Sequence, residues 1–208
     1  MPLKKRILAV SDIHGHVDSL SQLLEVTKYN SKNDQLILVG DYVNKGPDSI
    51  GTLKLVKQLQ AEGAIVLIGN HEMRWLESDE EQALEWRHFI EELPHIKILD
   101  NYIFAHAGID TNKDLQHQDR SIVTGHQPKE LNLNLPENKV LVHGHVPNFR
   151  LGYEDDELLF ENRIIGIDTG AGHDKYLTLV DLTNRIKYSI DVLDEKKEVV
   201  IKTMSRNL

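Results

Sequence analysis

Apolar runs and amphipathic stretches alternate along the first part of the chain. Three short apolar runs predict buried strands, and they cover residues 6–10, 35–39 and 64–68. Stretches with apolar residues at helical spacing follow these runs and cover residues 17–29, 48–60 and 73–93. Asp48 or Ser49 can cap the second helix, and Gly63 can end it. The pattern therefore predicts three strand–helix units in succession.

The pattern changes after residue 95, where most segments have the composition of strands. Strands are expected at residues 96–99, 102–105, 139–142, 163–167, 176–181 and 185–191, and the last residues can add an edge strand. Residues 110–138 are polar without firm periodicity, so we interpret them as an irregular or partly helical insert. Strand–helix units favour a parallel or mixed sheet, and late hairpins favour antiparallel strands. We therefore expect two packed sheets with helices outside.

Composition narrows the class of protein. The chain has 208 residues, of which 40% are hydrophobic and 27% charged, so one soluble globular domain over 1–208 is expected. The net charge of -9 argues against a surface for nucleic-acid polymers. The absence of cysteine excludes disulfides and thiolate metal sites, and it fits a cytoplasmic protein. No stretch approaches the ~20 apolar residues that span a bilayer, so no membrane association is expected.

Polar residues with metal-binding or catalytic chemistry recur where the expected strands end. Each of these short clusters follows an apolar run and lies beside a glycine. The clusters contain Asp12 and His14, Asp41, Asn70 and His71, His106, and His145. Ligand sites of α/β sheets form outside the carboxyl ends of the strands, so we expect the clusters to converge on one site.

The residue types favour a site with two metal ions. Asp, His and Asn without Cys suit Mn²⁺, Fe, Zn²⁺ or Mg²⁺. The six candidate ligands are too many for one ion and right for two ions that share the Asp41 carboxylate, and they are Asp12, His14, Asp41, Asn70, His106 and His145. Two-metal sites ~3.5–4 Å apart catalyse phosphoryl displacement, with a metal-bound hydroxide as nucleophile. His71 then remains free to act as the general acid.

Five motifs stand in the order found in the calcineurin-like metallophosphoesterases. They are Asp12-Ile13-His14-Gly15, Gly40-Asp41-Tyr42-Val43-Asn44-Lys45-Gly46, Gly69-Asn70-His71-Glu72, His106-Ala107-Gly108 and Gly144-His145. The chain most resembles the phosphoprotein-phosphatase branch in its small bacterial and phage form, which the symmetrical dinucleoside tetraphosphatases share.

The resemblance implies a fold, a metal centre and residue roles. The implied fold is an α/β (α+β) four-layer αββα sandwich of two mixed sheets flanked by helices. The implied centre is dinuclear, with Mn most expected and Fe, Zn or Mg as alternatives. Asp12 and His14 would bind the first ion, and Asp41 would bridge both. Asn70, His106 and His145 would bind the second ion, while His71 would be the proton donor.

One loop departs from the family pattern. Asn44 and Lys45 stand where the family has an Asp that pairs with the catalytic histidine and an Arg that grips phosphate. Asn44 can still accept a hydrogen bond from His71 but has no charge, and Lys45 keeps a positive charge without bidentate geometry. The expected catalytic residues are therefore His71 and Asn44. The candidate phosphate-binding residues are Lys45, Asn70, Arg120, which is the only Arg between His106 and His145, and Arg74.

Other residues near the motifs have simpler interpretations. His173 in its glycine loop is expected to be a turn residue, although it can contact substrate. Glu72 can be a motif residue or only a match to the helix dipole. Trp75 and Trp86 are expected to be packing residues.

Three functions remain open at this point. The main expectation is a phosphomonoesterase most like a bacterial Ser/Thr protein phosphatase, acting on a phosphorylated protein or a small phosphorylated metabolite or nucleotide. The alternative is a symmetrical bis(5'-nucleosyl)-tetraphosphatase. From another class, Asn44 and Lys45 allow a metal-containing binding module with weak turnover. The insert at 110–138 would roof the substrate, and its lack of Trp, Tyr and Phe favours the first function.

Overall fold

A computed structural model describes residues 5–125 and 135–204. Strands and helices alternate first, as β1 (Arg6–Val10), α1 (Val17–Val26), β2 (Asp34–Leu38), α2 (Ser49–Ala61), β3 (Ile65–Val66), α3 (Asn70–Leu76) and α4 (Glu81–Glu91). Strands then dominate, as β4 (Ile96–Leu99), β5 (Tyr102–Ala105), β6 (Val140–His143), β7 (Leu159–Glu161), β8 (Ile164–Gly166), β9 (Tyr176–Asp181), β10 (Ile186–Asp191) and β11 (Val199–Thr203). A short helix α5 (Arg120–Gly125) and the 3₁₀ turns η1 (Asn148–Leu151) and η2 (Ala171–His173) lie between strands.

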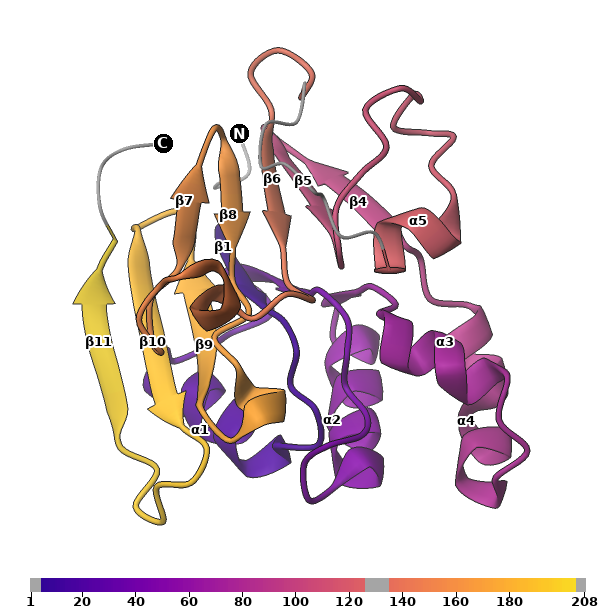
Figure 1. Cartoon of the computed structure of the whole chain (residues 1–208). Coiled ribbons are helices and arrows are strands. Elements are labelled where there is room, and N and C mark those ends of the chain that lie inside the picture. The colour runs from indigo at the N-terminus through magenta and orange to yellow at the C-terminus, as the bar shows by residue number, and fades with distance from the viewer. Residues whose placement is uncertain (1–4, 126–134, 205–208) are drawn as a thin grey trace.

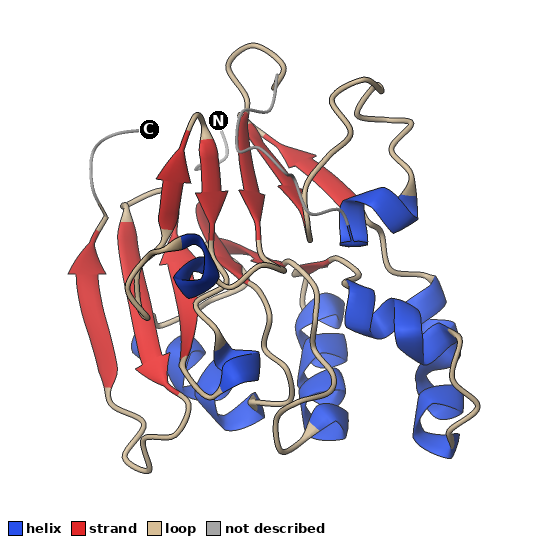
Figure 2. Cartoon of the chain, viewed as in Figure 1, coloured by secondary structure: helices blue, strands red, loops and turns tan. Residues whose placement is uncertain are grey.

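The strands form two mixed sheets (Figures 1 and 2). The first has the order β11-β10-β9-β1-β2-β3, in which β1, β2 and β3 are parallel and β9, β10 and β11 run antiparallel. The second has the order β4-β5-β6-β8-β7, with a parallel centre and antiparallel edges. This division follows the prediction, because strands joined by helices became parallel and strands joined by hairpins became antiparallel.

Alternation along the strands builds the layers of a sandwich. In β1, Leu8 and Val10 pack with residues of α1, α2, α3 and α4, whereas Ile7 and Ala9 pack against the second sheet. A third apolar cluster joins the outer face of the second sheet to Val123 of α5. Three apolar interfaces therefore separate helices, sheet, sheet and helix, and the predicted αββα arrangement of two mixed sheets is confirmed.

The expected helix over 73–93 is wrong in detail, because two helices cover this region. α3 begins earlier, at Asn70, and ends at Leu76, and α4 begins at Glu81. Between them, Ser78 Oγ accepts from the backbone N–H of Glu80. A short polar side chain that bonds to nearby backbone competes with helical hydrogen bonds, and this favours a turn at 77–80.

The insert at 110–138 is only partly described. Its first part holds a turn and α5, which agrees with a partly helical segment, while residues 126–134 lie outside the described residues. In the part of the chain that the structure describes, no helix has the length and apolar character needed to cross a membrane.

Candidate metal centre

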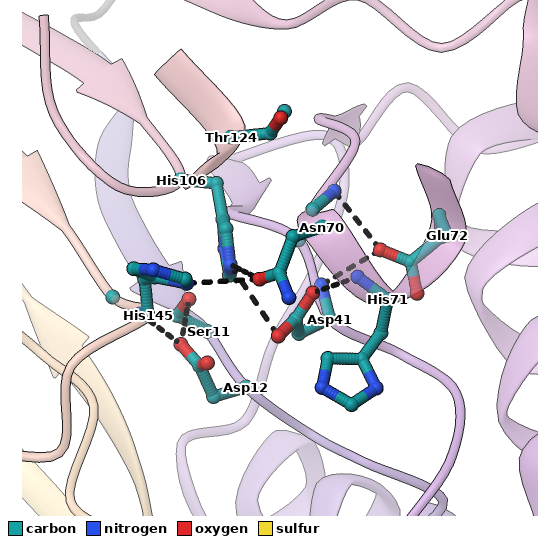
Figure 3. A network of polar contacts seen from close by, with 12 residues as sticks. Ser11, Asp12, Asp41, Asn70, His71, Glu72, His106, Thr124 and His145 are labelled. Carbon is teal, nitrogen blue, oxygen red and sulfur yellow. Dashed lines mark hydrogen bonds and ion pairs between the residues drawn. The ribbon is translucent and has the colours of Figure 1, made fainter. Parts of the chain in front are cut away.

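The predicted motif residues follow the carboxyl ends of five strands, and Figure 3 shows Asp12, Asp41, Asn70, His71, His106 and His145 gathered in one place. β1 leads to Asp12 and His14, β2 leads to Asp41, and β3 leads to Asn70 at the start of α3. His106 follows β5 and His145 follows β6, so both sheets contribute. Because parallel strands end at the same edge, residues up to 133 positions apart meet there, as Asp12 and His145 do.

One group of ligand atoms surrounds Asn70. The Oδ1 atom of Asn70 lies 3.0 Å from His106 Nε2 and 2.8 Å from His145 Nδ1. Asp41 Oδ2 lies 3.4 Å from His106 Nε2. The ligand atoms of Asp41, His106 and His145 all lie within 4.8 Å of one another, a spacing that one ion can bridge.

A second group lies on the other side of the Asp41 carboxylate. His14 Nε2 is 3.6 Å from Asp41 Oδ2 and 3.8 Å from Asp12 Oδ1. The other oxygen of Asp12 accepts from Ser11 Oγ at 2.6 Å and from the His145 backbone N–H at 2.9 Å, which fixes the carboxylate. His71 also lies within 4.8 Å of the ligand atoms of His14 and Asp41. Asp41 is therefore common to both groups.

The buried histidine rings are oriented by backbone carbonyls. His14 Nδ1 donates to the Val43 carbonyl at 3.0 Å, and His106 Nδ1 donates to the Val39 carbonyl at 2.9 Å. A carbonyl oxygen only accepts, so each Nδ1 has the hydrogen and each neutral ring has a lone pair on Nε2. Histidines that bind metals are commonly oriented in this way.

The backbone of these loops adopts conformations that side chains rarely allow. φ is positive at Asp12 (54°), His14 (47°), Asp41 (59°) and His145 (71°). Non-glycine residues pay a steric cost in this region, and such residues cluster at functional sites. A Cβ atom at Gly69 would overlap the Asp41 carboxylate. The loops thus approach one another more closely than ordinary turns do.

Glu72 holds two of these loops together. Its Oε2 atom accepts from the backbone N–H groups of Asp41 at 2.8 Å and Gly69 at 2.9 Å. Its Oε1 atom accepts from Tyr42 at 2.7 Å and Val43 at 3.2 Å. The carboxylate therefore does more than match the α3 dipole, because it bonds the Asp41 loop to the start of α3.

Electrostatics indicate surplus negative charge at the ligand atoms. Burial acts to lower the pKa of His106, but the charges of Asp41 and Asp12 outweigh it and raise this pKa to about 10. Burial likewise lowers the pKa of His145 to about 4, with the His106 charge adding to this effect. Burial and nearby positive charges lower the pKa of His71 to about 4, against the opposing charge of Asp41. Two carboxylates that attract protons onto a buried ring are also suited to cations.

These observations together fit a pair of divalent ions. The donors are carboxylate, imidazole and amide groups, the set that Mn²⁺, Fe, Zn²⁺ and Mg²⁺ accept. The ring hydrogens point away from the centre, and one carboxylate is shared by both groups. Bound ions would activate water and neutralise charge on phosphoryl oxygens.

A cavity of about 570 Å³ opens above the Asp41 carboxylate. Asn70, His71 and His145 line its base. Its wall contains positively charged or protonatable side chains, namely Lys45, Arg74, Arg150 and His173. Arg150 Nη2 lies 3.4 Å from His173 Nε2, and both come from 3₁₀ turns.

One expectation about the wall is wrong, and a second concerns an insert of which residues 126–134 lie outside the described residues. The Arg120 guanidinium does not line the cavity but donates to the carbonyls of Ile90, Glu91 and Leu93, at the end of α4. None of the described residues of the insert, at 110–125 and 135–138, lines the cavity either. The second Arg of the wall is Arg150, which the sequence analysis missed. The sequence signal that could have indicated Arg150 is its position, because it lies five residues beyond the candidate ligand His145, between Pro147 and Gly152.

Asn44 and Lys45 occupy the places expected from their motif. The Asn44 amide lies 2.9 Å from His71 Nδ1, so the expected pairing of these residues is present. Lys45 Nζ lies 3.2 Å from His14 Nε2, beside the candidate metal ligands. Arg74 Nη1 lies 3.4 Å from His71 Nε2 at the mouth of the cavity.

Comparison with known families identifies the chain. Residues 5–188 match the family described as calcineurin-like phosphoesterase. The chain belongs to the calcineurin-like phosphoesterase family. The resemblance seen in the five motifs is thereby confirmed.

Curated relatives of this phosphoesterase are symmetrical bis(5'-nucleosyl)-tetraphosphatases. The protein of Vibrio parahaemolyticus is 33% identical in an alignment of length 127 that covers 51% of this chain and 46% of the relative. That of Aeromonas hydrophila is 27% identical in an alignment of length 208 that covers 86% of this chain and 66% of the relative. The matched region thus spans about half the length of several curated relatives.

Solved structures show the same fold. A candidate diadenosine tetraphosphatase superposes with a TM-score of 0.69 at 23% identity and covers 99% of this chain and 97% of its own. A cold-active protein tyrosine phosphatase gives a TM-score of 0.59 at 17% identity, over 98% and 80% of the two chains. These neighbours establish the fold and do not separate the two expected functions.

Proposed function

We propose that this phosphoesterase hydrolyses a phosphoanhydride bond in a dinucleoside polyphosphate, in the manner named for its curated relatives. This is the alternative of the sequence analysis, and it replaces the Ser/Thr protein phosphatase as the favoured function. The names of the relatives support it. The single observation that supports it most within this chain is the row of cationic groups along the cavity wall.

A series of pairwise contacts links the residues of this row. Arg74 lies beside His71 at 3.4 Å, and the His71 ring lies edge-on to that of His14 with centroids 4.7 Å apart. Lys45 follows at 3.2 Å from His14 Nε2. Gly172 packs against the Lys45 side chain and brings the next residue, His173, toward Arg150.

A row of cations suits an extended chain of phosphates better than one phosphate group. A phosphomonoester presents its charge at one point, where one or two Arg or Lys side chains suffice. A tetraphosphate bridge spreads its charge over four linked groups, and a row of donors can bind several of them together. Asp41 is the one carboxylate among the described lining residues, and bound divalent ions would offset its charge.

In this proposal two divalent ions would be held by the six candidate ligands, namely Asp12, His14, Asp41, Asn70, His106 and His145. Mn²⁺ is the first ion to be tested. Water adds to a central phosphorus, the bridging P–O bond breaks, and two nucleoside diphosphates leave. Arg74 and Lys45 bind phosphoryl oxygens beside the centre, and Arg150 binds the phosphates farther along the wall. His71 lies where it can donate a hydrogen bond to the reacting group.

The test is a turnover panel on protein reconstituted with Mn²⁺. Diadenosine tetraphosphate, a phosphopeptide and an aryl phosphate are compared by kcat/KM. Asp41→Asn serves as the blank, and Asp18→Asn, an exposed acid at the start of α1, serves as the matched control. We expect ADP as the nucleotide product and a preference for the tetraphosphate of about tenfold or more, since each charged hydrogen bond contributes about 1.5–3 kcal/mol.

The other outcomes are informative in different ways. A preference for the phosphopeptide would instead support the protein-phosphatase function that the sequence analysis expected. Binding of the tetraphosphate without turnover by a protein that contains both ions would indicate a binding module. Release of AMP and ATP would contradict the symmetrical cleavage that we propose.

A further inference from the structure

A short chain of hydrogen bonds runs from the buried Trp75 through Asn44 to His71. Trp75 Nε1 donates to Asn44 Oδ1 at 2.9 Å. Asn44 Nδ2 lies 2.9 Å from His71 Nδ1. An indole nitrogen only donates, so the amide oxygen of Asn44 must face Trp75 and its NH₂ group must face His71.

This orientation decides which nitrogen of His71 has the hydrogen. The Asn44 NH₂ group is a donor, so His71 Nδ1 has to accept. A neutral imidazole has one N–H and one lone pair, and the hydrogen must therefore be on Nε2. Nε2 lies 3.4 Å from Arg74 Nη1 on the cavity side of the ring.

The three residues that make this chain are each held in place. The backbone N–H of Asn44 donates to Ser49 Oγ at 2.8 Å, and its φ of 67° is one that Asn tolerates better than most residues. Trp75 is buried in α3 within the helix-side core. The backbone N–H of His71 donates to Asp41 Oδ1 at 2.9 Å. These contacts fix the backbone from which the Asn44 and His71 side chains extend, and burial fixes the Trp75 ring.

We propose that Trp75 is a positioning residue that acts through Asn44 to hold His71 with its hydrogen on Nε2. In this state His71 Nε2 and Arg74 Nη1 are two donors 3.4 Å apart that face the same cavity. A phosphoryl oxygen between them accepts from both, which gives a bidentate grip next to the metal centre. The identity of the bound phosphate rests on the proposed function, whereas the state of the His71 ring does not.

A carboxylate at position 44 would give the opposite state. One oxygen would still accept from Trp75, and the other would accept a hydrogen from His71 Nδ1. The hydrogen would then leave Nε2, which would offer the substrate a lone pair in place of a donor. The residue at position 44 therefore determines what His71 presents to a phosphate, and Trp75 determines which way the Asn44 amide points.

The decisive experiment determines by long-range ¹H–¹⁵N NMR which ring nitrogen of His71 has the hydrogen. The protein is loaded with diamagnetic Zn²⁺ at about pH 8, above the ordinary His pKa, and His71 is assigned with His71→Gln. We expect Nε2–H in the wild type and Nδ1–H in Asn44→Asp. Trp75→Phe should give a mixture, because the freed amide can point either way.

Trp86→Phe is the matched control. Trp86 is a buried tryptophan of the same core, and within the described residues its indole N–H has no hydrogen-bond partner. This variant should keep Nε2–H and the wild-type kcat/KM within about twofold, whereas Trp75→Phe should lose about tenfold on the preferred substrate.

A wild-type ring with Nδ1–H, or a Trp75→Phe ring identical to the wild type, would overturn the proposal. If Trp75→Phe fails to fold, the Asn44→Asp spectrum still tests the proposal, because Trp75 keeps its packing in that variant. Failure of the proposed function is seen separately, since loss of tetraphosphate turnover does not change the tautomer.

Discussion

The base and the wall of the cavity are built in different ways. Four of the six candidate metal ligands at the base are buried, with His106 fully inaccessible, and backbone hydrogen bonds fix rings and carboxylates among them. The wall is formed by long side chains such as Arg74 and Arg150, which are exposed and make long contacts of 3.4 Å. The base is therefore arranged before anything binds, whereas the wall can adjust to its ligand.

This difference matches the two tasks that the cavity would have. Metal ions need ligands at fixed distances, so the positions of Asp41 and His106 cannot vary much. A chain of phosphates has many rotatable bonds and accepts cations in several arrangements. Substitutions at the base should therefore affect folding, metal content and turnover together, and substitutions in the wall should affect substrate binding alone.

Glu72→Gln should give the largest effect on stability and metal content, because Glu72 bonds the loops that hold the candidate metal ligands. Each carboxylate oxygen accepts two backbone N–H groups, and an amide NH₂ in place of one oxygen leaves two buried donors unpaired. A buried unpaired donor costs about 1–3 kcal/mol, so the free energy of unfolding should fall by about 2–5 kcal/mol. Urea unfolding measures this loss, and metal content should fall with it.

Glu85→Gln, an exposed residue of α4, is the control for the same chemical change. It should alter neither stability nor metal content. If Glu72→Gln behaved like this control, Glu72 would not hold the two loops together, and the contrast between base and wall would lose its physical basis.

The sequence predicted the base of the site but only part of its wall, namely Lys45 and Arg74, and the reason is physical. Asp12, Asp41 and His106 follow buried strands directly, so knowing the strands was enough to place them. Arg150 reaches the cavity only because η1 folds back beside η2, and nothing in the local pattern encodes that contact. Arg120 lay between the right motifs, but it bonds instead to free carbonyls at the end of α4.

Part of the fold, like part of the site, was predicted from the sequence. The apolar runs and the helical spacing of apolar residues predicted both sheets and most helices, because these patterns show directly which faces are buried. The break between α3 and α4 was missed, since 77–80 is as polar as an exposed helix face and local bonds of Ser78 decide the outcome. The expected pairing of Asn44 with His71 is present, but the expected direction was wrong. Asn44 donates to His71 because its amide oxygen accepts from Trp75, which the sequence suggested only as a packing residue.

Arg150→Ala should give an intermediate effect confined to the wall. Removing one charged donor from a bound tetraphosphate should raise KM about tenfold, because an exposed charged hydrogen bond contributes at the low end of about 1.5–3 kcal/mol. Turnover of an aryl phosphate, which does not reach along the wall, should change less than about twofold. Steady-state kinetics on both substrates measure the difference.

Arg120→Ala is the matched comparison. It removes a guanidinium that binds three carbonyls at the end of α4, so it should lower stability by about 1–2 kcal/mol and leave KM unchanged. If Arg120→Ala raised KM and Arg150→Ala did not, the original assignment of the phosphate-binding Arg would be restored.

The smallest expected effect is a change in the pKa of His173. Burial lowers this pKa below the ordinary value, and the positive charges of Lys45 and Arg150 lower it further. The ring is therefore neutral at pH 7 and becomes charged only as the pH falls through the lowered pKa. Arg150→Ala removes one repelling charge, so the pKa should rise, whereas Lys54→Ala on the exposed face of α2 should leave it unchanged.

A phosphate chain along the wall should shift the same group in the same direction. An anion beside His173 stabilises the charged ring, so inorganic tripolyphosphate should raise its pKa. By linkage, tripolyphosphate should in turn bind more tightly beside His173 as the pH falls through the pKa of its ring. NMR titration of the His173 ring, with and without tripolyphosphate, measures both effects. A pKa that tripolyphosphate leaves unchanged would mean that the phosphates do not extend beyond Lys45, and the wall would then serve a single phosphate group.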